Sequence, residues 1–344
     1  MSQQLQFVAS MTVSASDFKN IRSYLQLAQS TLNPLSKILI TPLFISDGSL
    51  GIVKALAQEG KSEVLFDSGG YYVQMGKISF ERLYLPLLDV YSKNMWASLY
   101  TLPDHVPVSK DSEEVVRYKV ENTITYSNLF YHEMPDELRS KAMPVVQGRT
   151  QSQIDRCLNS FIKMGVRWIG FGSFGTSGAN NEVNVATFQS INLARYVIEV
   201  AHQHNIKVHI FGVGAPALVA MLSGIGADSF DSAGWLKAAG YGMISLPLMR
   251  YWNITYQNQS SDFQKGIPVE EFYKLRQITK HQCALCSDIY KLQKIKMYRA
   301  VHNLISTSES VRIINERDSE YIQFVYANGS PKYREEFTKW LLAR

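Results

Sequence analysis

Short apolar runs alternate with amphipathic helical segments between residues 38 and 231, and this alternation restricts the possible folds more than any other feature. One helical segment, 151–165, places its apolar side chains on a single face, and a second such segment spans 184–205. The runs expected to form buried strands are 38–44, 63–67, 95–101, 142–147, 168–173, 207–212 and 227–231. Repetition of strand and helix predicts parallel strands joined by right-handed crossovers.

Polar or glycine-rich motifs follow the ends of several of these strands. They are Asp-Ser-Gly-Gly at 67–70, Pro-Asp-His at 103–105, Gln-Gly at 147–148, Gly-Ser-Phe-Gly at 172–175 and Phe-Asp-Ser-Ala-Gly at 230–234. Barrel enzymes build their sites at this end of the strands, whereas a dinucleotide-binding open sheet concentrates glycine in its first turn. The sequence therefore predicts an α/β fold of the (β/α)₈ TIM-barrel type, with a doubly wound open sheet as the alternative.

The sharpest chemical motif is His281-x-Cys283-x-x-Cys286, followed by His302. Two thiolates and two imidazoles form the closed tetrahedral ligand set of structural zinc sites. The alternative is a pair of buried free cysteines with two unrelated histidines. Cys157 lies on the apolar stripe of segment 151–165 and is expected to be a core residue.

Near residue 250 the alternation of apolar runs and helical segments ends, and the sequence becomes more polar and irregular. We expect residues 1–250 to form the barrel core that carries the active site. Residues 251–309 are expected to form a zinc-binding subdomain, which includes a basic helix over 287–307. Residues 310–344 are expected to form a C-terminal helical segment that packs on the barrel, because no interdomain linker is evident.

Charge and hydropathy set few limits on partners. The chain has 35 basic and 30 acidic residues, a net charge of +5, which permits a polyanionic partner without requiring one. The N-terminus lacks the features of a secretory signal, and no window reaches the roughly 18 apolar residues of a membrane span. With only three cysteines, a disulfide framework is not expected. We therefore expect a cytoplasmic protein without membrane association.

Two carboxylates follow strand ends in a way that suggests catalysis. Asp67 precedes Ser-Gly-Gly, and Asp231 ends the run 227–231, whose other carboxylate, Asp228, is expected to be structural. Two carboxylates at one barrel mouth suit glycosyl transfer by double displacement. Capping of a turn, or binding of a divalent metal in an enzyme of small metabolites, are the alternatives. His132, His202, His204 and His209 show no partner pattern and are expected to be surface or satisfied residues.

Taken together, these motifs resemble the guanine transglycosylase superfamily, best known from the tRNA-guanine transglycosylases. The resemblance covers about residues 60–305. Its motifs are Asp-Ser-Gly-Gly-Tyr at 67–71, Val-Val-Gln-Gly at 145–148, Phe-Gly-Val-Gly at 211–214, Phe-Asp-Ser at 230–232, and Cys-x-x-Cys at 283–286 with a later His-Asn at 302–303. Each motif is weak alone, whereas their common order is specific.

The resemblance implies a role for each matching residue. Asp231 would be the nucleophile that forms a covalent glycosyl-enzyme, and Asp67 the general acid and base. Asp104 and Gln147 would hold the edge of guanine. The remaining pocket residues that it implies are Tyr71 and Phe211 on the two faces of the base, and Gly148, Gly172, Ser173 and Gly212 along the pocket wall. Stacking on both faces and polar groups on the edge are what a flipped purine requires.

Two departures from the tRNA-modifying pattern are informative. The first zinc ligand is His281 where the family usually has Cys, and imidazole is an acceptable ligand. After the nucleophile, the family's Pro-Thr-Arg…Arg pattern is replaced by 232–242, in which Lys237 is the one basic residue. The base-exchange machinery is thus retained, while the pattern that grips the anticodon loop is absent.

This combination resembles the DNA-modifying branch of the superfamily, the DpdA proteins. It implies exchange of guanine in DNA for a free 7-deazaguanine base, with 7-cyano-7-deazaguanine as the expected base, in a bacterial cell or phage-infected host. Accessory DNA-modification proteins are candidate partners. Trp235, Tyr241 and the basic stretch 291–299 are expected to hold DNA. A tRNA substrate, or a non-catalytic nucleic-acid-binding subunit, are the alternatives. The implied chemistry uses structural zinc and needs no redox cofactor or ATP.

Overall fold

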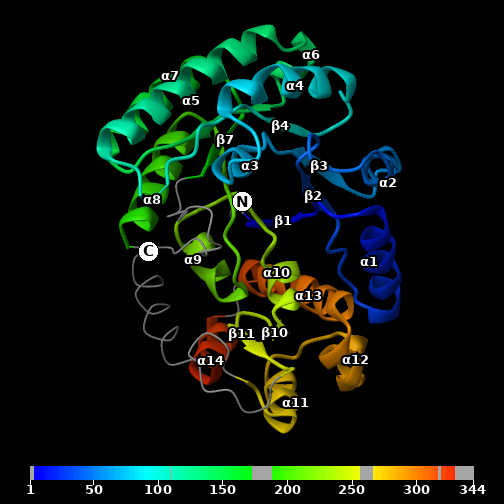
Figure 1. The fold of residues 1–344 in the computed structure, drawn as a ribbon. Helices are drawn as coiled ribbons and strands as arrows, with labels where there is room; N and C mark the ends of the chain where they lie inside the picture. The colour runs from blue at the N-terminus through cyan, green and yellow to red at the C-terminus, as the bar shows by residue number, and fades with distance from the viewer. Residues whose placement is uncertain (1–3, 109, 173–187, 256–265, 317–318, 330–344) are drawn as a thin grey trace.

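The computed structural model describes residues 4–108, 110–172, 188–255, 266–316 and 319–329 (Figure 1). Its main sheet has nine parallel strands in the order β5-β4-β3-β2-β1-β9-β8-β7-β6. The strands are β1 (Gln6–Ser10), β2 (Lys37–Ile40), β3 (Glu63–Phe66), β4 (Leu99–Thr101), β5 (Ala142–Met143), β6 (Val145–Val146), β7 (Trp168–Phe171), β8 (Lys207–Ile210) and β9 (Ser229–Ser232). Every predicted strand is confirmed, whereas β1 was not predicted.

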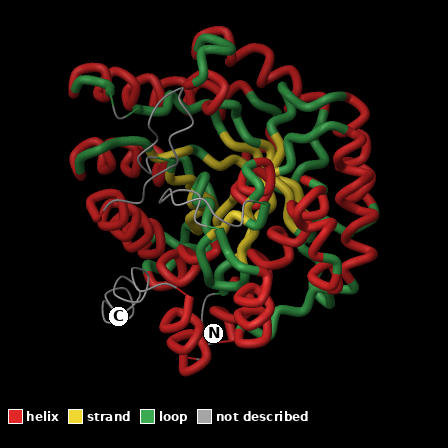
Figure 2. Tube along the Cα trace, turned by 60° about the horizontal axis from the view of Figure 1, so that its bottom comes forward, coloured by secondary structure: helices red, strands yellow, loops and turns green. Residues whose placement is uncertain are grey.

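The two ends of this strand order are adjacent in the chain. Only Pro144 separates β5 from β6, and proline interrupts a strand because it has no N–H to donate. The carbonyl of Pro144 still accepts a hydrogen bond from Gly170 N at 2.8 Å, so this link remains attached to β7. The sheet therefore curls into a nearly closed barrel, and Figure 2 shows its strands in the middle of the molecule with helices around them.

Helices between the strands form the outer layer of the barrel. They are α1 (Ala15–Ala28), α2 (Asp47–Gln58), α3 (Gly70–Gln74), α4 (Phe80–Lys93), α5 (Glu113–Glu133), α6 (Asp136–Arg139), α7 (Gln151–Lys163), α8 (Phe188–Gln203), the short η1 (Pro216–Leu218), α9 (Val219–Gly224) and α10 (Gly234–Gly240). The predicted helix 151–165 is confirmed as α7. It begins with a capping box between Thr150 and Gln153, and it buries Ile154, Cys157 and Phe161 against the core.

Side chains that point into the barrel include an apolar cluster and a group of polar residues. The apolar cluster is built around Val8, Leu39, Leu65 and Met143. Because side chains alternate along a strand, the inward position two residues beyond Val8 on β1 is Ser10, and Ser229 and Asp231 share one face of β9. Polar side chains therefore gather toward the carboxyl ends of these strands, the end at which barrel enzymes build their sites.

The rest of the chain packs below the barrel as seen in Figure 1. It comprises the antiparallel pair β10 (Met243–Ser245) and β11 (Tyr251–Asn253), and α11 (Val269–Ile278), the short η2 (Ala284–Ser287), α12 (Ile289–Lys294), α13 (Lys296–Glu316) and α14 (Ser319–Gly329). Helix α13 is buried along most of its length and packs against α10, α1, β10 and β1. It runs without interruption across position 309, so the residues on both sides of that position share one helix.

Three details of this region differ from the prediction or lie outside the description. The predicted helix 287–307 is interrupted at Ile295, where α12 ends before α13 begins. The C-terminal helical segment is described only as far as residue 329. Every described helix is too short or too polar to cross a lipid bilayer.

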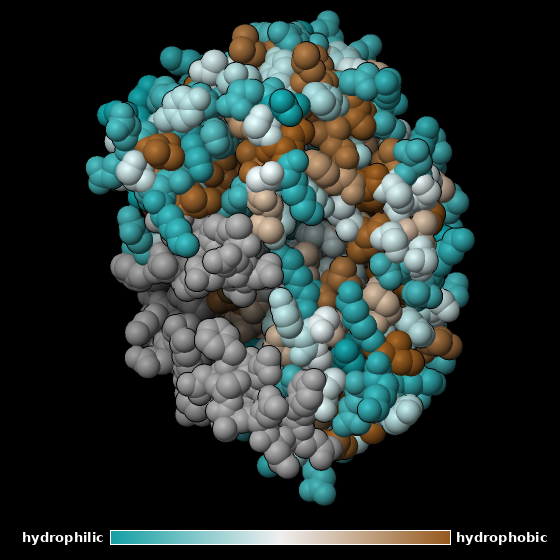
Figure 3. Space-filling view, in the orientation of Figure 1, coloured by the Kyte–Doolittle hydropathy of each residue, from teal (hydrophilic) through white to brown (hydrophobic). Residues whose placement is uncertain are grey.

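The surface of the molecule is not uniform. Figure 3 shows hydrophobic residues gathered over the upper part of the face in view and polar side chains around it.

Candidate active site and metal centre

Four predicted polar site residues follow four strands of the barrel. Asp67 follows β3, Asp104 follows β4, Gln147 follows β6, and Asp231 lies on β9. The carboxyl ends of parallel strands meet at one rim of a barrel, so these side chains share one mouth. Asp104, Gln147 and Asp231 are buried, and Asp67 is half-buried.

The Asp231 carboxylate is held by donors from two neighbouring strands. Oδ2 accepts a hydrogen bond from the Ser10 hydroxyl of β1, and Oδ1 accepts one from Gly212 N at 2.8 Å, just beyond β8. Only 6% of Asp231 is exposed. These two donors, which come from different strands, fix the orientation of the Asp231 carboxylate at the rim.

Asp67 has a different environment. Its Oδ2 accepts hydrogen bonds from the Thr41 hydroxyl at 3.0 Å and from Gly69 N at 3.3 Å. Burial, and next the negative charge of Asp104, raise the pKa of the Asp67 carboxyl from 3.8 to about 7, and Asp231 adds to this shift. A carboxyl with a pKa near neutrality exchanges protons readily in both directions, which is the property of a general acid and base.

Asp104 and Gln147 form one hydrogen-bonded unit. Asp104 Oδ2 accepts from Gln147 Nε2 at 2.7 Å, and Oδ1 accepts from the Ser68 hydroxyl at 2.7 Å. Burial raises the pKa of the Asp104 carboxyl above its ordinary value, while the bonds from Ser68 and Gln147 oppose that shift. A Cβ added at Gly172 would lie 2.7 Å from Gln147 Nε2, so glycine allows the chain to pass directly beside the amide.

Three further residues were expected to line the pocket: Gly148, Gly212 and Ser173. Gly148 has a positive φ of 151°, and an added Cβ there would lie 2.8 Å from Gln153 Cβ. Glycine at this position therefore permits the turn from β6 into α7. Gly212 contributes the backbone N–H that holds Asp231. Ser173 lies outside the described residues.

The two predicted stacking rings lie in different surroundings. Phe211 is half-buried in the barrel and packs over Gly170, where an added Cβ would lie 2.4 Å from its ring. Tyr71, on α3, is 45% exposed, and the Lys237 ammonium from α10 lies 5.2 Å from the centre of its ring. One ring thus packs inside the barrel, and the other is exposed beside a cation.

The surface expected to hold nucleic acid requires correction. Trp235 is fully buried, and its indole N–H donates to Ser232 O at 3.0 Å. Arg299 is also buried, and its guanidinium donates to the carbonyls of Ala239, Leu292 and Gln293. Both side chains are used inside the protein and are unavailable to a partner, which makes that part of the prediction wrong. Tyr241 is 56% exposed, as a contact residue must be.

The histidines outside the metal motif divide into two groups. His132 and His204 are exposed, as expected. His202 and His209, however, contact carboxylates. His202 Nε2 lies 2.9 Å from Asp228, which also accepts from Val208 N at 2.8 Å and so joins β8 to the start of β9. His209 is fully buried on β8, with Nε2 3.4 Å from Asp231 Oδ1. Alternation along β8 puts His209 on the same face as Phe211, a signal that sequence reasoning missed.

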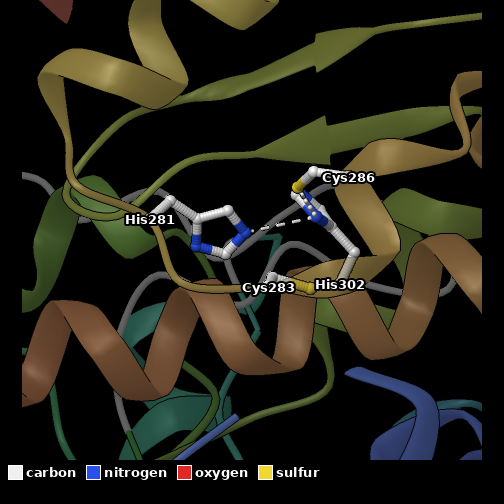
Figure 4. Close-up of side chains that lie close together, drawn as sticks. All are labelled: His281, Cys283, Cys286 and His302. Atoms are coloured by element: carbon white, nitrogen blue, oxygen red, sulfur yellow. Dashed lines mark hydrogen bonds between the residues drawn. The ribbon is translucent and has the colours of Figure 1, made fainter. Parts of the chain in front are cut away.

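The metal motif converges on one point (Figure 4). One ligand atom from each of His281, Cys283, Cys286 and His302 lies within 4.8 Å of the others, and all four residues are buried. The first three come from the segment between α11 and α12, and His302 comes from α13. The predicted ligand set is therefore brought together in space, and it could hold a metal ion.

Both imidazoles are oriented by a second partner. His281 Nδ1 donates to the carboxylate of Glu309, which also accepts from Gln282 N at 2.9 Å. His302 Nε2 donates to Ser245 O at 2.9 Å, which leaves Nδ1 facing the cluster. Such outer partners fix the tautomer of a ligating histidine. Glu309 was not predicted, because it lies outside the motif and its role depends on where α13 passes.

The donor chemistry fits a metal. A hydrogen bond from Cys286, and further those from the two imidazoles, lower the pKa of the Cys283 thiol, so this sulfur is disposed to be a thiolate. Burial raises the pKa of the Cys286 thiol, and, against the effect of burial, hydrogen bonds with Cys283 and Glu309 raise the pKa of His281 to about 9. Since thiolates and neutral imidazoles are the ligating forms, an ion that binds here would displace protons from Cys286 and His281. Because three candidate ligands precede α12 and the fourth lies on α13, an ion here would connect these two parts of the fold.

No protein-family model matches this chain, and neither does any curated protein. The family resemblance therefore rests on the sequence motifs alone.

Proposed function

We propose that the protein is a DNA-guanine transglycosylase that exchanges guanine in DNA for a 7-deazaguanine base. The observation that carries this proposal is the pairing of two unlike carboxyl groups at one barrel mouth. The Asp231 carboxylate is oriented by hydrogen bonds from Ser10 and Gly212, whereas burial and the charge of Asp104 raise the pKa of Asp67 to about 7. A carboxylate held in one orientation beside a carboxyl group with a raised pKa is typical of a nucleophile paired with an acid and base.

The first half-reaction releases guanine. A flipped guanosine would enter the mouth, with the edge of its base against Asp104 and Gln147. Asp231 attacks C1′, the C1′–N9 bond breaks, and its electron pair stays on N9 of the leaving base. Protonated Asp67 donates a proton to that base, so neutral guanine leaves and a sugar ester on Asp231 remains.

The second half-reaction reverses these steps with a new base. Ionised Asp67 removes a proton from N9 of the incoming 7-deazaguanine, and N9 attacks C1′. The ester bond breaks, and its electron pair returns to the Asp231 carboxylate. Two inversions give net retention at the sugar. One group thus alternates between its two protonation states, for which a pKa of about 7 is well suited.

Two features of the rim favour nucleic acid as the substrate. Lys237 lies over the ring of Tyr71, and Lys77 lies 5.1 Å from the ring centre of the adjacent Tyr72. Paired aromatic rings and cations suit the bases and phosphates of a strand. The absence of arginines from 232–242 favours DNA over an anticodon loop.

Two finer structural assignments belong to the same proposal. If β5 and β6 are one strand broken at Pro144, the nine strands become the eight of a (β/α)₈ barrel. The ion held by His281, Cys283, Cys286 and His302 is zinc in a structural role, since a closed set of two thiolates and two imidazoles leaves no position for substrate. It would hold the segment before α12 against α13.

The test is base exchange with radiolabelled guanine offered with duplex DNA, single-stranded DNA and tRNA in parallel. We expect label in DNA, and with wild-type protein a denaturation-resistant protein–DNA adduct. Asp231→Asn keeps the size of the side chain and should abolish both signals. Asp47→Asn, at an exposed position on α2, is the matched control and should retain both. Label in tRNA alone would overturn the DNA assignment, and exchange by Asp231→Asn would overturn the mechanism.

A further inference from the structure

The imidazole of His209 lies beneath the carboxylate of Asp231. It is fully buried on β8, its Nδ1 lies 2.8 Å from Ser229 Oγ, and its Nε2 lies 3.4 Å from Asp231 Oδ1. Among the described residues, no atom forms a hydrogen bond of good geometry with this Nε2. A buried polar nitrogen without such a bond destabilises the fold, so its place beside a carboxylate calls for a reason.

We infer that His209 is a positioning residue, which donates from Nε2–H to Oδ1 of Asp231 and selects Oδ2 as the attacking atom. This inference deepens the proposed function and rests on it. Oδ1 then has two donors, Gly212 N and His209, whereas Oδ2 has the rotatable hydroxyl of Ser10. The better-held oxygen becomes the carbonyl of the sugar ester.

The Asp231 carboxylate decides which ring nitrogen of His209 carries the proton. A tautomer with a lone pair on Nε2 would direct it at Oδ1 and would be repelled, so the proton lies on Nε2. The Ser229 hydroxyl can either donate or accept, and it then donates to Nδ1. The ring is held in place by its edge-to-face contact with Phe211, with 4.6 Å between ring centres.

The consequence falls on the second half-reaction. When N9 of the incoming base attacks C1′, the C1′–Oδ2 bond breaks and negative charge returns to the Asp231 carboxylate. A donor on Oδ1 stabilises that charge, which the neutral ester lacks, so it makes Asp231 a better leaving group. Loss of the donor should therefore slow breakdown of the adduct more than it affects binding of the free base, which Asp104 and Gln147 contact.

The test compares His209→Met, which keeps the size of the side chain without a donor, with His209→Gln, which retains an N–H group. For His209→Met we expect kcat to fall about 10- to 100-fold, with the KM for free base within about threefold and more protein trapped as DNA adduct. His209→Gln should lie within about fivefold of wild type. Equal losses in both variants, or no loss in His209→Met, would overturn the inference while leaving wild-type base exchange intact.

A second measurement does not depend on activity. In nitrogen-15 spectra of histidine-labelled wild-type protein at neutral pH, the His209 ring should show a protonated Nε2 and an unprotonated Nδ1. The signal is assigned by its absence from His209→Gln, or by its shift in Ser229→Ala. A protonated Nδ1 with a bare Nε2 would refute the inference, whereas failure of wild-type base exchange would refute the proposed function instead.

Discussion

His281 Nδ1 donates a hydrogen bond to Oε2 of Glu309, which lies two turns beyond His302 on the same helix, α13. The carboxylate is 3% exposed, and it also accepts from Gln282 N. Glu309 therefore connects the segment that carries three candidate ligands to the helix that carries the fourth. Carboxylate, histidine and metal in series form the arrangement that orients a ligating imidazole.

Glu309→Ala is expected to weaken zinc binding about 10- to 100-fold, because His281 loses the partner that fixes its ring and tautomer. Competition with a chromophoric chelator measures the change. Glu316→Ala, which removes an exposed carboxylate paired with Arg312 on the same helix, is the control and should bind as wild type does. Equal affinities for both variants would show that Glu309 does not support the site.

Cys286→Ser is expected to lose the metal and to lower the melting temperature, because a structural zinc site contributes directly to folding. Cys157→Ser is a matched control, since Cys157 is also buried but donates to the carbonyl of Gln147 on the other side of the fold. Elemental analysis should find about one zinc ion per chain in wild type and in Cys157→Ser. Metal that remains in Cys286→Ser would contradict the ligand assignment.

The sequence identifies those elements and residues that are marked by a pattern within a short segment of the chain. The strand that ends at Asp67 is a short apolar run, and α7 has an apolar stripe, so both follow from periodicity alone. The candidate ligands are recognisable because their spacing is a property of the chain. β1 was not predicted, although Phe7, Val8 and Ala9 form a short apolar run within Gln6–Ser10.

The residues that sequence reasoning misjudged owe their environment to distant segments. A helical pattern does not say which side of α13 is covered, so Arg299 was expected at the surface although it caps carbonyls inside the fold. Trp235 was expected at a DNA surface for the same reason. His209 and Glu309 acquire partners 20 and 28 residues away along the chain, and no local pattern encodes such pairs.

Gly172→Ala is expected to weaken binding of free guanine about 10- to 100-fold without unfolding the protein. The added methyl group would lie 2.7 Å from Gln147 Nε2 and would push this amide away from Asp104. Gly51→Ala is the matched control, because an added Cβ there meets no atom within 4 Å on α2. The control should gain up to about 1 kcal/mol of stability, since alanine favours a helix. Titration of guanine by calorimetry distinguishes the two variants.

Asp67→Asn is expected to stabilise the fold above pH 7 but not below pH 4. The folded pKa of about 7 exceeds the ordinary 3.8, so the unfolded chain binds fewer protons between these values. The free energy of unfolding of wild type therefore falls, through this group, as pH rises from about 4 to 7. Asparagine does not ionise, so in the variant this group no longer lowers the free energy of unfolding as pH rises. Thermal melts of both proteins across this range should diverge as pH rises, and parallel curves would contradict the raised pKa.

The release of guanine should depend on pH through the same carboxyl group. Only protonated Asp67 supplies the proton that the leaving base needs, so the single-turnover rate should be constant below pH 7 and fall about tenfold per pH unit above it. Quenched-flow measurement of free guanine from labelled DNA gives this rate. Asp67→Asn should be slower at every pH and should lack the break near pH 7, whereas Asp47→Asn should reproduce the wild-type profile. A break that persists in Asp67→Asn would assign the proton to another group.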